Sequence, residues 1–346
     1  MQEMERIGGM RLMGTTNGKA APAAPGQAGE LRFSGPPVCV VGNVNRDVKL
    51  LNVPPAPGLF EDGETTVGGI VETIGGGGAN SACAAAALGA TVRFLGKTGA
   101  DALGERLGQT LERHGVQARL RRDPRCPTGT SVALGFTTGR RHFLSRLPNN
   151  EMLGFDDLDL AGLDGCAHLL RADVWFSQPM LEDGNRRLFA EARRRGLATS
   201  LDINFDPCWA GGPATEIARR KGLLRGVLDL VDLAHGNVRE LREFADSPDL
   251  DTALRRLADW GVKATVVHLG PQGAGYYAAG RLIVEPPDPA VRPVNLTGTG
   301  DVLSICMILL HARPELTVPQ KLRLANRVVR EFMEGKRVLI PELVSV

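Results

Sequence analysis

The sequence lacks the features that mark membrane, nucleic-acid-binding and disulfide-linked proteins. Its 346 residues contain no run of about 18 apolar residues and no secretory signal segment. The net charge is only +2, which gives no reason to expect nucleic acid or an anionic membrane as a partner. The six cysteines show no CxxC spacing, so neither a zinc site nor a disulfide framework is predicted. We therefore expect a cytoplasmic protein.

Several common catalytic motifs are also missing. There is no G-x-x-x-x-G-K-[ST] segment, which argues against a P-loop kinase, and no G-x-S-x-G nucleophile motif. The glycine run at 75–78 lacks the later spacing and the acidic partner of a dinucleotide site. The six histidines have no metal-ligand spacing, so core or surface positions are expected for them.

Short apolar runs alternate with helical patterns along most of the chain. The run 38–42 suits a buried strand, the alanine-rich segment 79–88 a helix, 91–95 a strand and 101–114 a helix. The same rhythm returns from Asp173–Phe176, read as a strand, to a final helix at 318–333. This alternation predicts an α/β protein with a parallel sheet covered by helices. Residues 1–35 lack any such pattern and are predicted to be a disordered tail.

Two segments break the α/β rhythm. Residues 48–74 contain β-like pieces and prolines, and residues 128–146 contain two β-rich runs joined at Thr138-Gly139-Arg140, which predicts a hairpin. We expect the two segments to form a small β-sheet that acts as a lid. Short basic runs, among them Arg140-Arg141, are interpreted as solvated faces.

The stretch Gly298-Thr299-Gly300-Asp301 leads directly into the apolar run 302–310. A glycine turn that becomes a helix N-terminus attracts anions through free N–H groups and the helix dipole. The carboxylate in the first turn lies where an alcohol could be deprotonated. An anion site beside a base is the minimum equipment for phosphoryl transfer to a hydroxyl. The alternative is a structural loop with Asp301 as the helix cap.

Five more polar or glycine-rich sites follow predicted strands. In a parallel sheet these strand ends lie on one edge, where ligands bind. The five sites are Asn45 and Asp47, Gly75–Asn80, Asp202 and Asn204, Asn237 and Glu240, and Gly270 and Gly273.

From about residue 38 to about 333 the chain resembles the ribokinase-like, or PfkB-type, carbohydrate kinases. Four motifs carry the resemblance in the right order: Gly-Gly-Gly-Ala-Asn80-Ser-Ala followed by Gly89 and Gly99; Asn237-Val-Arg-Glu240; His268-Leu-Gly-Pro-Gln-Gly273; and Asn295-Leu-Thr-Gly-Thr-Gly-Asp301. The resemblance implies one kinase domain at 36–346, with a three-layer α/β/α fold around a mostly parallel central sheet. It also implies a small β-sheet lid and a homodimer formed through that lid.

The resemblance further implies transfer of the ATP γ-phosphate to a hydroxyl of a small sugar. Asp301 would be the general base, and Gly298, Thr299 and Gly300 would form the anion hole. Glu240, helped by Asn237, would hold Mg²⁺ through water. The acceptor would be bound by Asn45, Asp47, Asn80 and the backbone of Gly76 and Gly77, and the nucleotide by Gly270, Gly273 and Asn326 in addition to Asn237.

The sequence departs from the family pattern at a few positions. Asn295 stands where relatives have an Asp near a monovalent-cation site; its amide oxygen brings no charge, which weakens the expectation of K⁺ activation. Gly77 replaces a lysine of ribose-specific members, and Ile305-Cys306 replace two small residues. Two alternatives therefore stay open: a nucleoside kinase, with Phe136 or Phe143 as stacking groups, and a sugar- or nucleotide-binding regulatory protein with little activity.

Overall fold

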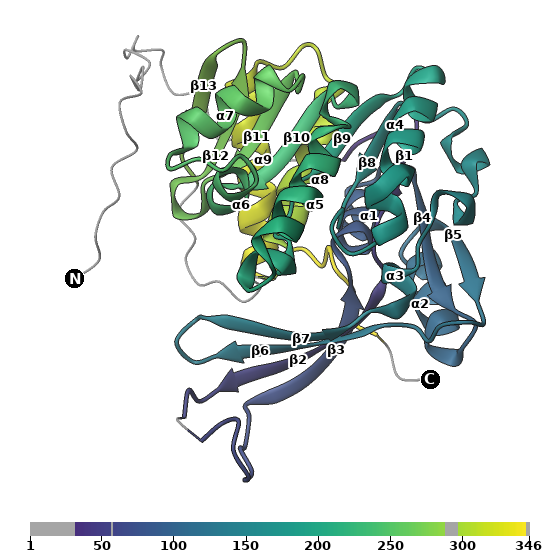
Figure 1. The fold of residues 1–346 in the computed structure, drawn as a ribbon, viewed down its shortest axis with the longest axis vertical. Coiled ribbons are helices and arrows are strands. Elements are labelled where there is room, and N and C mark those ends of the chain that lie inside the picture. The colour runs from purple at the N-terminus through teal and green to yellow at the C-terminus, as the bar shows by residue number, and fades with distance from the viewer. Residues whose placement is uncertain (1–31, 57, 288–296, 344–346) are drawn as a thin grey trace.

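The computed structural model describes residues 32–56, 58–287 and 297–343. Within these residues, nine strands form a central sheet in the order β13-β12-β11-β10-β9-β8-β1-β4-β5 (Figure 1). In chain order the strands are β1 (Val38–Val41), β4 (Val92–Gly99), β5 (Val116–Asp123), β8 (His168–Arg171), β9 (Ala198–Asp202), β10 (Leu233–Asn237), β11 (Ala264–His268), β12 (Ala274–Ala278) and β13 (Arg281–Glu285).

The central sheet is parallel from β11 to β5. Strand β12 runs antiparallel to both of its neighbours, β11 and β13. From β1 the chain adds β4 and β5 on one side, and it later adds β8 and its successors on the other. The strand order therefore reverses between β1 and β8. A switch point of this kind opens a crevice at the carboxyl ends of the strands, where α/β proteins bind ligands.

Helices cover both faces of the central sheet, which confirms the predicted three-layer α/β/α class (Figure 1). One face packs against α1 (Gly77–Ala87), α2 (Ala102–Arg113), α8 (Thr299–His311) and α9 (Val318–Met333). The other face packs against α4 (Asn185–Arg194), α5 (Ala214–Arg225), α6 (Val238–Phe244) and α7 (Leu250–Asp259). A short helix, α3 (Pro148–Glu151), follows the small sheet.

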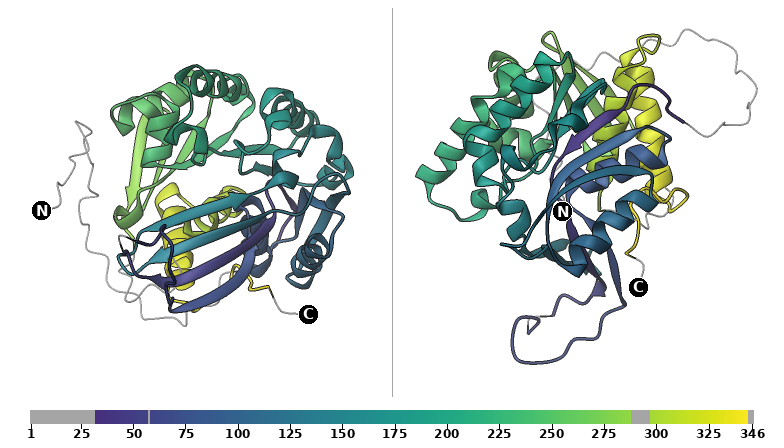
Figure 2. Two further views of the ribbon diagram at one scale, coloured as in Figure 1. Left: turned by 60° about the horizontal axis from the view of Figure 1, so that its bottom comes forward. Right: turned by 90° about the vertical axis from the view of Figure 1, so that its right-hand side faces the viewer.

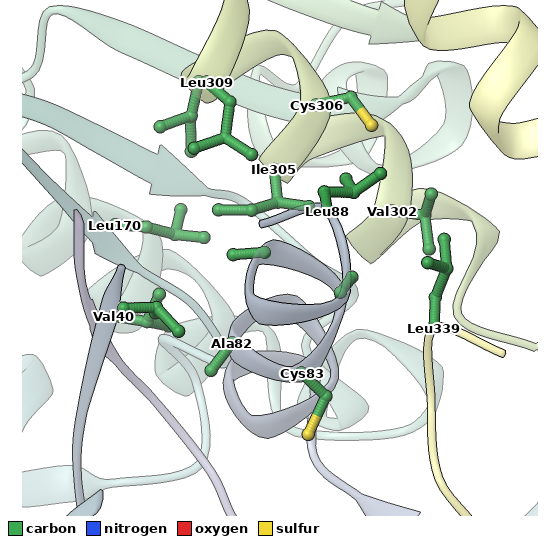
Figure 3. Packing of buried hydrophobic residues seen from close by; sticks show 14 of the residues in the cluster. Val40, Ala82, Cys83, Leu88, Leu170, Val302, Ile305, Cys306, Leu309 and Leu339 are labelled. Atoms are coloured by element: carbon green, nitrogen blue, oxygen red, sulfur yellow. The ribbon is translucent and has the colours of Figure 1, made fainter. Parts of the chain in front are cut away.

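Helices α1 and α8 pack against each other in the core. Alanines fill most of α1, so it has high helix propensity and lets a neighbour approach closely. The larger side chains come from α8, in which every residue from Val302 to Leu310 is buried. Figure 3 shows side chains of α8, among them Ile305, in the space between the two helices. This packing fixes the N-terminus of α8 relative to that of α1.

A second, four-stranded sheet stands apart from the central one (Figures 1 and 2). We call it the small sheet; its strands are β2 (Asn45–Val53), β3 (Gly69–Gly75), β6 (Thr130–Phe136) and β7 (Arg141–Arg146), in the order β3-β2-β6-β7. The two segments predicted to break the α/β rhythm thus pair with each other. The C-terminal segment adds one bridge to its edge, between Thr73 and Glu342.

Two local predictions differ from the structure. The strand predicted at Asp173–Phe176 is wrong, because β8 ends at Arg171 and Asp173 has a φ of 56°, in the left-handed region. The apolar residues that follow, Val174 and Trp175, pack in the core without joining the sheet. Strand β5 was not predicted, because its central residues alternate with arginines at the sheet edge. Within the described residues no helix is long and apolar enough to cross a bilayer. Asn295 and residues 1–31 of the predicted tail lie outside the described part.

Candidate active site

The crevice at the switch point is organised around Asp173, which follows β8. Its carboxylate accepts hydrogen bonds from the backbone N–H groups of Asn43 (2.9 Å), Gly77 (3.0 Å) and Gly78 (2.8 Å). Its own N–H donates to Asn204 Oδ1, at 2.8 Å. One residue therefore connects the end of β1, the start of α1 and the segment after β9. This anchoring holds the glycine run at the N-terminus of α1 in place.

The glycine turn before α8 forms the opposite side of the crevice. Gly298 is the N-cap of α8 and has a φ of 88°, in the left-handed region that glycine tolerates. Asp301 lies in the first turn and does not cap the helix, so the alternative in which Asp301 is the helix cap is wrong. Its carboxylate instead accepts a hydrogen bond from Asn80 Nδ2 of α1, at 2.9 Å.

The electrostatic surroundings of Asp301 disfavour its charged form. Burial raises the pKa of this carboxyl to about 8, and the nearby carboxylates Asp173, Glu240 and Asp47 add to the rise. The hydrogen bond from Asn80 acts in the opposite direction. A carboxylate of this kind accepts a proton more readily than an exposed aspartate does.

Asn45 and Asp47 lie within β2, on the small sheet, although they were expected directly after the first strand of the central sheet. Asp47 Oδ1 accepts a hydrogen bond from Asn45 Nδ2, at 2.8 Å. Burial raises the pKa of Asp47 to about 6. Gly75 lies directly against this pair, because a Cβ built on it would stand 2.1 Å from Asp47 Oδ1. The pair therefore belongs to the base of the small sheet, where it meets α1.

Three buried polar atoms near this junction have no hydrogen-bond partner among the described residues. They are Asn43 Oδ1, Thr73 Oγ1 and Asn80 Oδ1. Thr73 is paired in register with Asp47 across the small sheet, and Asn80 is the residue that binds Asp301. Buried polar groups normally find partners. Oxygen atoms without donors at this place suit the hydroxyl groups of a bound polyol.

Asn237 and Glu240 form a reciprocal capping box at the start of α6. Glu240 Oε2 accepts from the Asn237 N–H at 2.8 Å, and Asn237 Oδ1 accepts from the Glu240 N–H at 2.9 Å. Glu240 stays partly buried, and that burial raises its pKa. Asp202, at the end of β9, is buried beside it, so its pKa is raised well above the usual range. The capping role thus leaves one oxygen of Glu240 for a cation.

A cavity of about 630 Å³ extends from the glycine turn towards α9. Gly270 and Gly273 line it on one side and Asn326 on the other, so these three predicted nucleotide residues share one cavity. Asn326 Nδ2 donates to the carbonyl groups of Glu285 and Pro286, at 3.1 Å each. The remaining walls include His268, Thr299 and Gly300 and the apolar side chains of Leu303, Val329 and Met333. Such a largely apolar cavity next to an anion site suits a nucleotide.

Two cations of the small sheet face the crevice. Arg141 of β7 lines the same cavity and donates through Nη1 to Thr297 Oγ1, at 2.9 Å, just before the glycine turn. Arg141 is exposed, as predicted for the Arg140-Arg141 pair, and it makes this hydrogen bond in addition. Lys49 of β2 lies on the same face as Asp47, two residues further along the strand, and is half-buried.

The structure brings together most of the predicted residues and adds others. The Gly77 N–H, predicted to bind the acceptor, is already engaged by Asp173. Asp173 itself was missed, because the apolar residues after it attracted the strand prediction. The signal that could have found it is the acidic residue two positions after the buried run 168–171. For Lys49 and Arg141 no local signal exists, since exposed cations are common on strands.

Comparisons with known proteins identify the family of this chain. The model of the family described as pfkB family carbohydrate kinase matches residues 36–305. The ribokinase of Arabidopsis thaliana is 26% identical over 284 residues, which cover 78% of this chain and 69% of the relative. Fructokinase-2 of Zea mays is 30% identical over 248 residues, which cover 68% of this chain and 70% of the relative.

A solved structure of a ribokinase II candidate from E. coli, in complex with ATP and Mg²⁺, is similar to this chain, with a TM-score of 0.72 and 21% sequence identity. The match covers 86% of this chain and 92% of that chain. At this identity the likeness shows the fold alone. The family model, however, matches well over half of the sequence, and the chain therefore belongs to the pfkB family of carbohydrate kinases.

Proposed function

We propose that this carbohydrate kinase transfers the γ-phosphate of ATP to a hydroxyl group of a small sugar, with Asp301 as the general base. The observation that carries the proposal is the position of the Asp301 carboxylate. It lies in the first turn of α8, directly after the Gly298–Gly300 turn, and is held by Asn80 from the neighbouring helix. A base and an anion site thus meet at one point of the crevice.

In the proposed step, the acceptor oxygen attacks the γ-phosphorus as the bond to the β,γ-bridging oxygen breaks. The hydroxyl proton passes to Asp301, and ADP leaves with the electron pair of the broken bond. The N–H groups at the start of α8 face the transferring phosphoryl group, whose negative charge the helix N-terminus stabilises. Position and charge stabilisation supply most of the catalysis in reactions of this type.

The residues present fit a magnesium ion. Asp202 is buried and Glu240 is partly buried, and neither forms an ion pair among the described residues. Mg²⁺ is usually held by one or two carboxylates, waters and substrate phosphates. When bound, the ion would neutralise charge on the β- and γ-phosphates. The E. coli structure with ATP and Mg²⁺ supports the same pair of cofactors here. Asn295 lies outside the described residues, and we assign it no role in K⁺ binding.

The acceptor would lie between the two sheets. Asp47 and the unpartnered oxygens of Asn43, Thr73 and Asn80 would accept hydrogen bonds from its hydroxyl groups. The adenosine of ATP would occupy the cavity between Gly270, Gly273 and Asn326. In this arrangement the small sheet acts as a lid over the transferring group, which excludes water from it.

A nucleoside acceptor is a second candidate, because one observation favours it. Phe143 of β7 is 45% exposed and lies on the face of the small sheet that also carries Arg141. A base could stack on this ring. Measuring ADP release with a panel of sugars and nucleosides as acceptors distinguishes a sugar kinase from a nucleoside kinase. ATP binding without ADP release across the whole panel would instead support a regulatory protein.

The other face of the small sheet supports a homodimer. Ile70 and Leu144 are 66% and 51% exposed there, and Val48, Leu50 and Val132 lie between them in register. An apolar sheet face of this kind marks an interaction site. We propose that two copies of the chain meet at this face.

Replacing Asp301 by Asn tests the base. We expect Asp301→Asn to lower kcat by about 10² to 10⁴-fold, because an amide cannot accept the proton. ATP binding, measured by calorimetry, should change little. In the parent enzyme kcat/KM should rise with pH and level off near pH 8, where Asp301 loses its proton. A variant with normal turnover would show that another group is the base.

A further inference from the structure

The face of the small sheet that looks into the crevice carries two cations and few anions. Register places Lys49 opposite Val71 and Ala133, and Ala133 opposite Phe143, so these side chains share a row. The adjacent row holds Asp47, Thr73, Ser131 and Ser145. Arg141 follows on the same face of β7. The face therefore passes from hydroxyl-binding groups at its base to cations further out.

Lys49 is a half-buried cation without a direct partner. Within the described residues its ammonium group makes no hydrogen bond and no ion pair, although most cations of this chain do. Burial lowers its pKa, while Asp47, Glu342 and Asp301 oppose that effect from outside ion-pair distance. A half-buried ammonium group without a counterion carries a desolvation cost that a bound anion would remove.

The two cations contact different parts of the crevice, although Arg141 is close enough to lower the pKa of Lys49. Arg141 lines the nucleotide cavity and contacts the segment before α8, so it faces the phosphates of ATP. Lys49 is not part of that cavity's wall and stands about 6 to 7 Å along β2 from Asp47, on the same face. Its position is therefore on the acceptor side of the transferring phosphoryl group.

Three carboxylates of the crevice lie at the central sheet, away from Lys49. Asp173 is satisfied by three backbone N–H groups and Glu240 by the start of α6. Asp202 and Glu240 both lie at the central sheet, where magnesium is proposed. On the small sheet itself, Asp47 and Glu342 are the carboxylates that act on Lys49, and both lie outside ion-pair distance of its ammonium group.

We propose that the phosphate acceptor is a sugar that carries an anionic group, a phosphate monoester or a carboxylate, and that Lys49 binds this group. The inference rests on the proposed kinase function and names its substrate class. The reacting hydroxyl lies at Asp301, the other hydroxyl groups lie at Asp47, and the anionic end points along β2 to Lys49. Arg141 serves the nucleotide phosphates.

The test compares matched neutral and anionic acceptors. The pairs are fructose with fructose 6-phosphate, which probes a phosphate monoester, and glucose with gluconate, which probes a carboxylate. We expect kcat/KM to favour the anionic member of at least one pair by about tenfold or more, the effect of one charge-assisted contact. The pair that shows the preference identifies the anionic group. A preference for the neutral member of both pairs would overturn the proposal.

Variants of Lys49 assign the preference to one side chain. Lys49→Met should lose about tenfold in affinity for the anionic acceptor and less than about twofold for the neutral one, whereas Lys49→Arg should keep most of the preference. Arg46→Met is the matched control, since Arg46 lies on the opposite face of β2 and pairs with Glu72. An equal loss for both acceptors, or a loss confined to ATP, would contradict the assignment.

A binding measurement separates failure of this inference from failure of the proposed function. Calorimetry with a non-hydrolysable ATP analogue present measures the binding of each acceptor to the parent protein and to Lys49→Met. If no acceptor releases ADP but the anionic sugars bind and lose affinity in Lys49→Met, the kinase proposal fails and the Lys49 site stands. If phosphoryl transfer occurs with neutral sugars alone, the kinase proposal stands and the Lys49 inference fails.

Discussion

At the scale of single residues, the site is a group of carboxylates, and their burial opposes their ionisation. The pKa is raised to about 6 for Asp47 and to about 8 for Asp301, and it is also raised for Glu240 and Asp202, in each case chiefly by burial. Groups of this kind cluster at functional sites, because the same burial that costs stability makes a carboxylate a stronger base.

The raised pKa of Asp301 predicts a pH-dependent stability difference. Its unfolded pKa is near 3.8 and its folded pKa about 8, so the folded protein binds the extra proton between these values. Stability should therefore be lost as the pH rises from about 4 to about 8. Asp301→Asn should be more stable than the parent above pH 8, by on the order of 2 kcal/mol after allowance for solvent in the crevice.

Thermal unfolding of both proteins at pH 4, 6, 8 and 9 measures this difference. The gap in Tm should be smallest at pH 4 and should stop growing above pH 8. Asp156→Asn, at a carboxylate that is exposed to solvent, is the matched control and should show no such trend. A gap that does not depend on pH would mean that Asp301 titrates normally in the folded state.

At the scale of elements, the glycine turn depends on a segment far away in the sequence. Ile340, from the C-terminal segment, lies directly against Gly298, since a Cβ built on this glycine would stand 2.3 Å from Ile340 Cδ1. The same segment joins the edge of β3 through the Ile74 N–H to Pro341 and the Leu343 N–H to Glu72. The turn that forms the proposed anion hole is therefore held between α8 and this segment.

Gly298→Ala should lower both stability and activity. The left-handed φ costs about 1 kcal/mol for a residue with a Cβ, and the overlap with Ile340 adds about 1 to 3 kcal/mol. Urea unfolding measures the loss of stability, and kcat measures the loss of activity. Gly196→Ala is the control, because Gly196 has a φ of 79° with no atom near its Cβ position. The double variant with Ile340→Ala should recover part of the loss; no recovery would exclude the overlap as the cause.

At the scale of the whole molecule, the residues of the proposed site come from both sheets. The central sheet supplies the strand ends with Asp173, Asp202 and His268, and the small sheet supplies Asp47, Lys49 and Arg141. Across the crevice, Arg141 of the small sheet donates a hydrogen bond to Thr297, in the segment before α8. If the small sheet acts as the proposed lid, its movement would change the distance between the acceptor groups and Asp301.

The proposed homodimer is tested at this scale. Sedimentation should show a dimer for the parent chain and a monomer for the double variant Ile70→Glu, Leu144→Glu, because two charges per copy cannot be buried in an apolar interface. Val338→Glu, at a residue that is 72% exposed but lies outside this face, should leave the dimer intact. A parent chain that sediments as a monomer at all concentrations would contradict the proposal.

The sequence by itself determined the parts of the site whose chemistry is local. Glycine at 298 and an acidic residue three positions later predict a turn and a helix start whatever surrounds them, and Asn237 with Glu240 predicts a capping box from spacing alone. The alternation of apolar runs also determined the fold class, because a buried strand and an amphipathic helix have different periods.

Only the tertiary structure decided which side chains meet. Asp173 binds three N–H groups that lie about a hundred residues away in the chain, and the path of the chain between β1 and β8 brings them together. Lys49 and Arg141 face the crevice because the register of β2, β6 and β7 places them on that face of the small sheet. Strand order and register depend on contacts between distant segments, and these are set by the packing of the whole fold.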